Sequence, residues 1–189
     1  MLGDIKIIEL SNTIGGAACT KMLGDLGADV LKIEPPKVGD PSRYEPPFLG
    51  ETLDPDRSAL FLAYNTNKKG ITLNLETQEG RDLLFKLIES VDVIVESYPV
   101  GYLDNLGIGY SALSAINPKA ILVSITPFGQ TGPYAERASF GYIVEAFAGI
   151  PGAIGYSDVP PVLSTLADPI AALVSLYGVM FALYHRDTH

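Results

Sequence analysis

Histidine and cysteine are scarce in this 189-residue sequence, and their scarcity limits the chemistry open to it. His185 and His189 are the only histidines and stand at the extreme C-terminus, so upstream histidines cannot build a Ser-His-Asp or Cys-His device within one chain. Cys19 is the only cysteine, which excludes an internal disulfide framework and a cysteine-based zinc cluster. Carboxylates therefore remain as candidate nucleophiles or bases, and no metal site is expected.

Asp168 is the unusual carboxylate, because it follows Leu166-Ala167 and heads a long apolar segment. With Pro169 behind it, Asp168 has the pattern of a helix N-cap followed by proline at the first helical position, which needs no function. The same position would partly desolvate the carboxylate, and such a group could attack a thioester carbonyl to form an acyl-enzyme anhydride. Composition favours the structural role, but the physics of the sequence leaves both roles open.

Gly15-Gly16 is the candidate for phosphate binding. The pair lacks the G-x-G-x-x-G spacing of dinucleotide-binding turns and also the G-x-x-x-x-G-K-[ST] phosphate loop. A tight turn from a strand into a helix is the favoured interpretation.

Short β-branched runs alternate with helical stretches, and these elements must position the candidate residues. The clearest strands are Ile5 to Leu10, Asp29 to Ile33, Asp92 to Glu96 and Ala120 to Ile125. The better helices are Gly16 to Leu26 and the run to Ser90 that Thr77-Gln78-Glu79 opens with an N-cap and an early acid. This alternation predicts an α/β fold with a Rossmann-like, largely parallel sheet and flanking helices.

Two further segments have distinct compositions. Pro35 to Arg57 carries six prolines among charges and glycines, so we expect an extended excursion that lies over a site or a partner. The last helix, about Asp168 to His185, is hydrophobic almost all round and needs burial on more than one side.

Bulk composition narrows the class of protein. A hydrophobic content of 47% allows a real core in one or at most two domains. The formal net charge of -9 argues against a nucleic-acid or membrane-surface partner. No apolar run is expected to approach the roughly 18 residues that span a bilayer. The single cysteine indicates a reducing compartment, by default the cytoplasm.

Seven short motifs follow one another along essentially the whole chain, and each occurs once. They are Ile8-Glu9-Leu10, Leu26-Gly27-Ala28-Asp29-Val30-Leu31-Lys32-Ile33-Glu34, Gly39-Asp40-Pro41, Asn67-Lys68-Lys69, Val95-Glu96-Ser97-Tyr98, Gly107-Ile108-Gly109-Tyr110 and Phe128-Gly129-Gln130-Thr131-Gly132-Pro133-Tyr134. In this set the chain resembles the class III CoA-transferase family, which includes formyl-CoA transferase, carnitine CoA-transferase and the α-methylacyl-CoA racemases.

The resemblance implies an architecture. Residues 1–189 would form the N-terminal CoA-binding α/β domain, the large-domain portion of an interlocked-dimer fold. Relatives continue into a second domain and a return segment, so the chain is expected to be the front part of such an enzyme and to form a homodimer.

The resemblance also implies chemistry: coenzyme A moves from an acyl-CoA donor to a carboxylic-acid acceptor. The catalytic aspartate, which forms mixed-anhydride and enzyme-bound CoA-thioester intermediates, matches Asp168, and this reverses the preference drawn from composition. Contacts to coenzyme A would map onto Ile14-Gly15-Gly16, Asn67-Lys68-Lys69 and Ser97-Tyr98, where amides and ammonium groups meet phosphates and an aromatic face meets adenine. A solvated turn is the alternative for Lys68 and Lys69.

Two other readings compete with transfer. The racemase branch carries an Ala-Gly-His-Asp phrase that lines up with Ala138-Ser139-Phe140-Gly141, so its histidine base would be Phe140 here. Proton exchange next to a thioester normally uses an acid and a base on opposite faces, which favours transfer over racemisation. A truncated chain that binds coenzyme A or a partner polypeptide without turnover is the non-enzymatic alternative.

Overall fold

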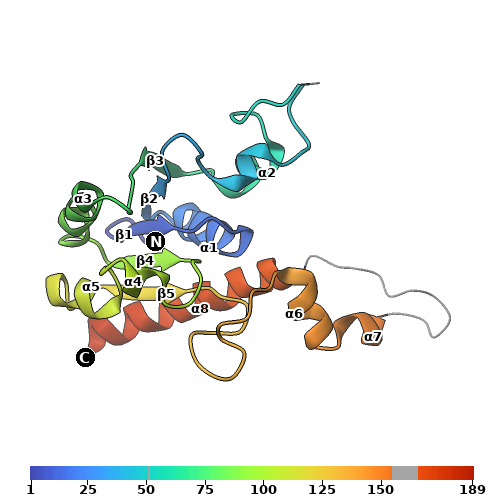
Figure 1. The fold of residues 1–189 in the computed structure, drawn as a ribbon. Coiled ribbons are helices and arrows are strands. Elements are labelled where there is room, and N and C mark those ends of the chain that lie inside the picture. The colour runs from blue at the N-terminus through green and yellow to red at the C-terminus, as the bar shows by residue number, and fades with distance from the viewer. Residues whose placement is uncertain (51, 155–165) are drawn as a thin grey trace.

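The computed structural model describes residues 1–50, 52–154 and 166–189. Within these residues one five-stranded sheet has the order β3-β2-β1-β4-β5, and every neighbouring pair is parallel (Figure 1). The strands are β1 Lys6–Leu10, β2 Asp29–Glu34, β3 Lys68–Thr72, β4 Val93–Glu96 and β5 Ile121–Ser124. The predicted α/β fold with a largely parallel sheet is confirmed.

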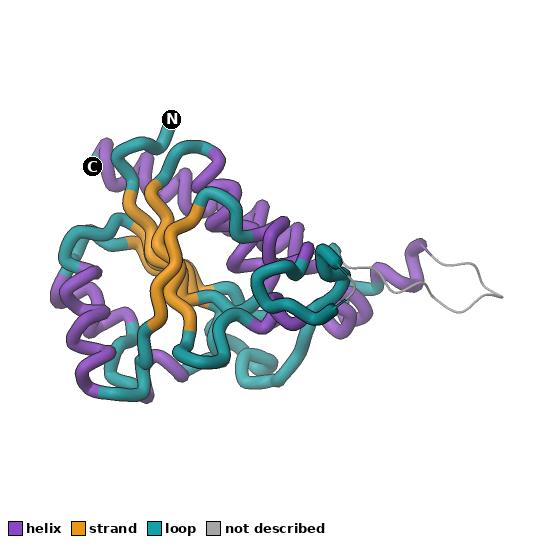
Figure 2. The backbone as a smooth tube through the Cα atoms, turned by 90° about the horizontal axis from the view of Figure 1, so that it is seen from above, coloured by secondary structure: helices purple, strands orange, loops and turns teal. Residues whose placement is uncertain are grey.

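Helices cover both faces of this sheet (Figure 2). They are α1 Ile14–Asp25, α2 Ala59–Tyr64, α3 Gln78–Ile88, α4 Tyr102–Asn105, α5 Tyr110–Ile116, α6 Gly141–Phe147, α7 Ile150–Ile154 and α8 Ala167–Thr188, with a 3₁₀ turn, η1, at Pro41–Tyr44. One core cluster joins α1 and α8 to the sheet, and the other joins α3 to α5. In β1 the adjacent Ile7 and Ile8 enter opposite clusters, as expected for a central parallel strand buried on both faces.

β3 is the strand that the sequence analysis did not predict. A solvated turn was the alternative to CoA contacts for Lys68 and Lys69, but these residues open an edge strand whose later residues are exposed. Lys69 reaches Asp29 on the surface at 2.7 Å, whereas the Lys68 side chain is only 2% exposed. A solvated turn is therefore wrong for Lys68.

Helix α8 is confirmed and runs for 22 residues. With 22 residues and a mean hydropathy of 1.5 over its apolar window, α8 is long and apolar enough, by length and composition, to cross a bilayer. The expectation that no segment approached such a length was wrong, because it counted uninterrupted apolar residues instead of a window average. Ala172, Val179 and Leu183 pack into the core beside α1, but only 17% of the apolar window is buried in the structure.

A buried network of charges joins the sheet to α1 and to the proline-rich excursion. Lys32 Nζ lies 2.6 Å from a Glu9 carboxylate oxygen and 2.6 Å from an Asp40 oxygen. Lys68 Nζ lies 2.8 Å from the other Glu9 oxygen, which also accepts a hydrogen bond from the Thr20 hydroxyl at 2.6 Å. Each buried charge thus has partners of opposite sign, as burial requires.

This network fixes where the excursion leaves the sheet. Burial opposes ionisation of Lys32, but the two carboxylates hold its pKa above the ordinary lysine value. The Asp40 carboxylate in turn accepts hydrogen bonds from the Ser42 backbone N–H and hydroxyl, which caps η1. Two guanidinium nitrogens of Arg43 donate hydrogen bonds to the two carboxylate oxygens of Glu34, at 2.7 and 2.8 Å. This bidentate pair fixes the first turn of the excursion at the carboxyl end of β2.

Candidate active site

The strand order reverses direction between β1 and β4. The chain passes from β1 outward through β2 and β3, and then returns to β4 and β5 on the other side. At this switch point Ser11, just after β1, has its hydroxyl 2.9 Å from that of Ser97, just after β4. Ligands of open α/β sheets bind in the crevice outside the carboxyl ends of the strands at such a point.

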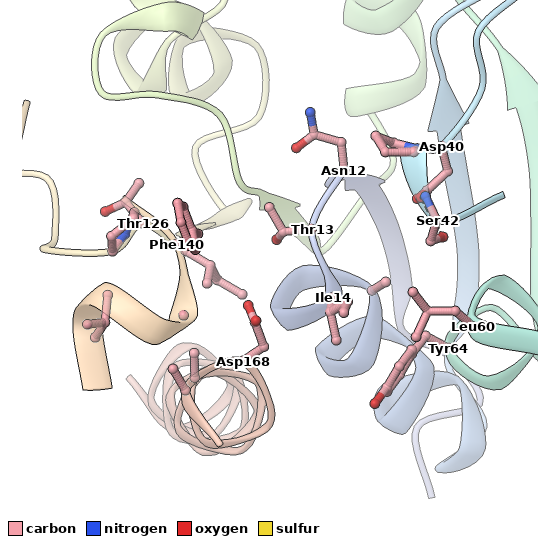
Figure 3. Close-up of a pocket in the computed structure, with 18 of the residues that line it drawn as sticks. Asn12, Thr13, Ile14, Asp40, Ser42, Leu60, Tyr64, Thr126, Phe140 and Asp168 are labelled. Carbon is pink, nitrogen blue, oxygen red and sulfur yellow. Dashed lines mark hydrogen bonds between the residues drawn. The ribbon is translucent and has the colours of Figure 1, made fainter. Parts of the chain in front are cut away.

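A cavity of about 450 Å³ lies beside this switch point, between the start of α1 and the start of α8 (Figure 3). Its apolar wall includes Ile14, Leu60, Tyr64, Phe140 and Val144. Its acidic residues are Asp40, Glu45 and Asp168. The excursion from Pro35 to Arg57 supplies part of the wall, as predicted, and α6 supplies the part that faces α8.

Asp168 points into this cavity from the first turn of α8 (Figure 3). The helix begins at Ala167 after Leu166, which has helical dihedral angles, so the interpretation of Asp168 as the N-cap is wrong. The Gly15 backbone N–H lies near the Asp168 carboxylate and favours its charged form. A Cβ on Gly141 would lie 3.3 Å from the carboxylate Oδ2, so the two glycines bring main chain close to the carboxylate.

The electrostatic setting of Asp168 favours a carboxylate more basic than usual. Partial burial raises its pKa, the Gly15 N–H opposes this shift, and the charge of Glu145 adds to it. Among the described residues lining the cavity there is no lysine or arginine. A half-buried anion that lacks a cationic partner in its cavity is a stronger nucleophile than a solvated or ion-paired one.

A second cavity of about 480 Å³ adjoins the first at the same edge of the sheet. Asn12, Asp40 and Pro41 line both cavities, so the two lie side by side with a shared wall and together make up the cleft at this edge of the sheet. Tyr98 and Tyr102 line the second cavity with rings stacked 4.7 Å apart. Burial raises the pKa of Tyr98 to about 12, so this residue presents a neutral aromatic face.

The structure brings together most of the predicted site residues. Ile14 lines the first cavity, Gly15 contacts Asp168, and Gly16 is buried against Ser11. Ser97 lies at the switch point, with its hydroxyl 3.1 Å from the Asn12 backbone nitrogen, and Tyr98 lines the second cavity.

Asn67, Lys68 and Lys69 lie elsewhere. Asn67 donates to Asp25 at the end of α1, so this phrase begins at the amino edge of the sheet, away from the cleft. Lys68 is held between Glu9 and the Ala17 carbonyl oxygen, and burial lowers its pKa to about 8. None of the three lines either cavity.

Sequence reasoning missed the segment that follows β3. Leu73, Asn74, Leu75 and Glu76 line the second cavity opposite the Pro35 to Asp40 segment. Recognising β3 as a strand would have found them, because residues after neighbouring parallel strands meet at one edge of the sheet. In residues 1–50, 52–154 and 166–189, no group of three or more His, Cys, Asp or Glu side chains is placed to hold a metal ion.

The two glycines that open α1 should respond differently to alanine. A Cβ on Gly16 would overlap the Ser11 hydroxyl, whereas a Cβ on Gly15 would make ordinary contacts at 3.5 Å. We expect Gly16→Ala to lower the free energy of unfolding by about 1–3 kcal/mol, because a packed neighbour must move. Gly15→Ala, one residue away, should change stability by less than about 1 kcal/mol. Urea unfolding of both variants makes the comparison, and equal losses would contradict the close packing at Gly16.

The chain is similar to known proteins over nearly its whole length. The model of CoA-transferase family III matches residues 2–189. A succinyl-CoA–D-citramalate CoA-transferase from Chloroflexus aurantiacus is 37% identical over 98% of this chain and 46% of its own length. A succinate–glutarate CoA-transferase from Agrobacterium fabrum is 38% identical over 97% of this chain and 47% of its own length.

A solved structure is also similar. The crystal structure of a CAIB/BAIF family protein from Brucella suis superposes with a TM-score of 0.91 and 39% identity, over 98% of this chain and 50% of that one. The chain thus spans about half the length of the relatives it matches. The family model and these relatives together establish that the chain belongs to CoA-transferase family III.

Proposed function

We propose that this chain carries the CoA-binding cleft and the nucleophile of an enzyme that transfers coenzyme A between an acyl-CoA and a carboxylic acid. The observation that carries the proposal is the Asp168 carboxylate, half-buried and aimed into a cavity that shares a wall with the cavity lined by Tyr98 and Tyr102. The family assignment supports CoA transfer in general, and the finer mechanism rests on this geometry.

In the proposed reaction, an Asp168 carboxylate oxygen attacks the thioester carbonyl carbon. The C–S bond breaks, the CoA thiolate leaves, and a mixed acyl-aspartyl anhydride remains. The thiolate then attacks the aspartyl carbonyl, which releases the donor acid and forms an aspartyl-CoA thioester. The acceptor carboxylate displaces the thiolate from this thioester and forms a second mixed anhydride, between the acceptor acid and Asp168. The thiolate then attacks the acceptor carbonyl of this anhydride. The product acyl-CoA leaves and the Asp168 carboxylate is regenerated, with no net proton transfer.

The cleft suits coenzyme A in one orientation. The stacked rings of Tyr98 and Tyr102 offer an aromatic face for adenine in the second cavity. The shared wall at Asn12, Asp40 and Pro41 then leads the pantetheine arm towards Asp168. Ile14, Gly15, Ser97 and Tyr98 remain proposed CoA contacts. Asn67, Lys68 and Lys69 would contribute only through the position of β3, because their side chains face away from the cleft or are already paired.

Racemisation is the weaker candidate. Phe140, which stands at the position of the racemase histidine, lines the first cavity with a hydrocarbon ring. Such a ring cannot exchange a proton, so the histidine base of the racemase phrase has no counterpart at position 140.

Trapping the covalent intermediate tests the proposal. The protein at its natural length, with any subunit that copurifies, is mixed with an acyl-CoA panel, and hydroxylamine is added. A hydroxamate at residue 168, identified by peptide mass, is the expected result, together with new acyl-CoA when an acid is supplied. Transfer of coenzyme A without any modification at residue 168 would overturn the proposed nucleophile. Entry of solvent deuterium at the α-carbon of the acyl group, in the absence of an acceptor acid, would indicate racemisation. Binding of coenzyme A with neither reaction would leave the chain as a binding module.

The proposal extends to a cytoplasmic homodimer. The outer side of α8 exposes Val174, Tyr177, Phe181 and Tyr184 at 64–71% of their surface, a large apolar area that a second chain would cover. The lone thiol of Cys19 is buried, and burial raises its pKa to about 12, which suits a reducing compartment without demanding one. The molar mass in solution decides the assembly state.

A further inference from the structure

Helix α8 begins without a local cap. Leu166 has no capping side chain, and the polar groups of the first turn must find partners elsewhere. The partner of the Ala167 backbone N–H is the Glu145 carboxylate, whose Oε1 accepts its hydrogen bond at 2.8 Å. The cap therefore comes from α6, 22 residues earlier in the chain.

Placing the Glu145 carboxylate inside the packed side of α6 costs free energy that packing alone does not explain. It is 2% exposed in a seven-residue helix whose other side chains are mostly apolar. Burying a carboxylate costs several kcal/mol unless hydrogen bonds compensate, and a neutral side chain would fill the same space at lower cost. The carboxylate also lies close enough to Asp168 to raise the pKa of that residue. The hydrogen bond to Ala167 and the effect on the pKa both connect Glu145 to Asp168, the next residue along the chain after Ala167.

We propose that Glu145 is a positioning residue of the active site, which fixes the first turn of α8 and so aims the Asp168 carboxylate into the cleft. This inference rests on the proposed function of Asp168. Glu145 does not line either cavity, so its effect on the reaction passes through Asp168 and not through contact with substrate. Two other acids, Asp40 and Glu45, line the first cavity with Asp168, but the charge of Glu145 is the one that raises the pKa of Asp168.

Two substitutions separate the hydrogen bond from the charge. Glu145→Gln keeps an oxygen that can accept the Ala167 N–H but removes the charge, whereas Glu145→Leu removes both. We expect kcat of the leucine variant to fall by about 10–100-fold with KM for acyl-CoA unchanged within about threefold, because a small misplacement of a reacting group has effects of this size. The glutamine variant should keep kcat within about threefold. Glu79→Gln, on the exposed side of α3, is the matched control and should change nothing.

The pH profile gives a readout that a purely structural role would not move. Glu145 raises the pKa of Asp168, so its neutralisation lowers that pKa, and the nucleophile stays ionised to lower pH. The acid limb of kcat/KM should shift to lower pH in Glu145→Gln and not in Glu79→Gln. This measurement also serves if the leucine variant does not fold.

The outcomes distinguish the inference from the function it rests on. If the wild type forms a hydroxamate at residue 168 but Glu145→Leu keeps kcat and Glu145→Gln leaves the acid limb in place, the role of Glu145 is refuted and that of Asp168 stands. If the wild type transfers coenzyme A with no adduct at residue 168, the nucleophile itself is wrong. A leucine variant that loses KM rather than kcat would mark Glu145 as a substrate-binding residue and would also overturn the inference.

Discussion

Replacing Asp168 with asparagine is expected to lower the rate of CoA transfer by about 10³-fold or more, because the nucleophile that forms the covalent intermediate is lost. Asparagine has nearly the same shape and keeps an oxygen that can accept the Gly15 N–H. Burial raises the pKa of Asp168, which means that the fold disfavours the charge, so its removal should not lower the free energy of unfolding. Activity should fall while stability is kept or rises slightly.

The matched control for this substitution lies on the same helix. Asp187→Asn removes an exposed carboxylate near the C-terminal end of α8, where Asp187 pairs with Arg186 at 3.1 Å, and should leave the rate within about twofold of wild type. Steady-state rates and hydroxylamine trapping are measured on both variants. Full activity of Asp168→Asn would mean that another group attacks the thioester, whereas a loss in both variants would point to the helix rather than to the carboxylate.

The second large effect concerns stability. Lys32→Met should lower the free energy of unfolding by about 3–5 kcal/mol, because it leaves the Glu9 and Asp40 carboxylates buried without their shared cation. Lys68 pairs only with the far oxygen of Glu9 and cannot reach a position equivalent to that of Lys32 without leaving its own contacts. Asp40 also caps η1, so the excursion that lines the cleft should loosen along with the core.

Lys69→Met is the control for this loss. Lys69 pairs with Asp29 at 2.7 Å, but its side chain is 71% exposed, and exposed pairs contribute about 0–1 kcal/mol. Urea unfolding gives the midpoint and the slope for both variants, and an unchanged slope shows that the comparison is one of stability. Comparable midpoints in Lys32→Met and Lys69→Met would refute the importance of the buried network.

The sequence predicts well the parts of this fold that depend on local pattern. Strands β1, β2, β4 and β5 are β-branched runs and were placed within about one or two residues of their observed ends. Strand β3 was missed because its Lys-Lys-Gly start has the composition of a turn and its exposed edge position removes the apolar signal. Missing β3 also hid the Leu73 to Glu76 wall of the second cavity.

The candidate site was predictable only in part, for a related reason. Local rules make Asp168 with Pro169 a helix cap, and only the family resemblance favoured a nucleophile. The actual start of α8 depends on Glu145, which lies on another helix, and no local pattern reveals a hydrogen bond across that separation. Lys68 shows the same limit, because a lysine in a polar phrase is read as solvated until the packing of α1 against the sheet is known.

The central place of β1 has a consequence during synthesis. β1 leaves the ribosome before the other four described strands, yet one of its two neighbours, β4, begins at Val93. At translation rates of about 5–20 residues per second, that edge of β1 stays unpaired for roughly ten seconds. Ile7, Ile8 and Leu10 are buried in the finished fold, so for this interval the nascent chain presents an apolar strand with a free hydrogen-bonding edge. The nascent chain is therefore most exposed to aggregation, and most dependent on chaperones, before β4 has emerged.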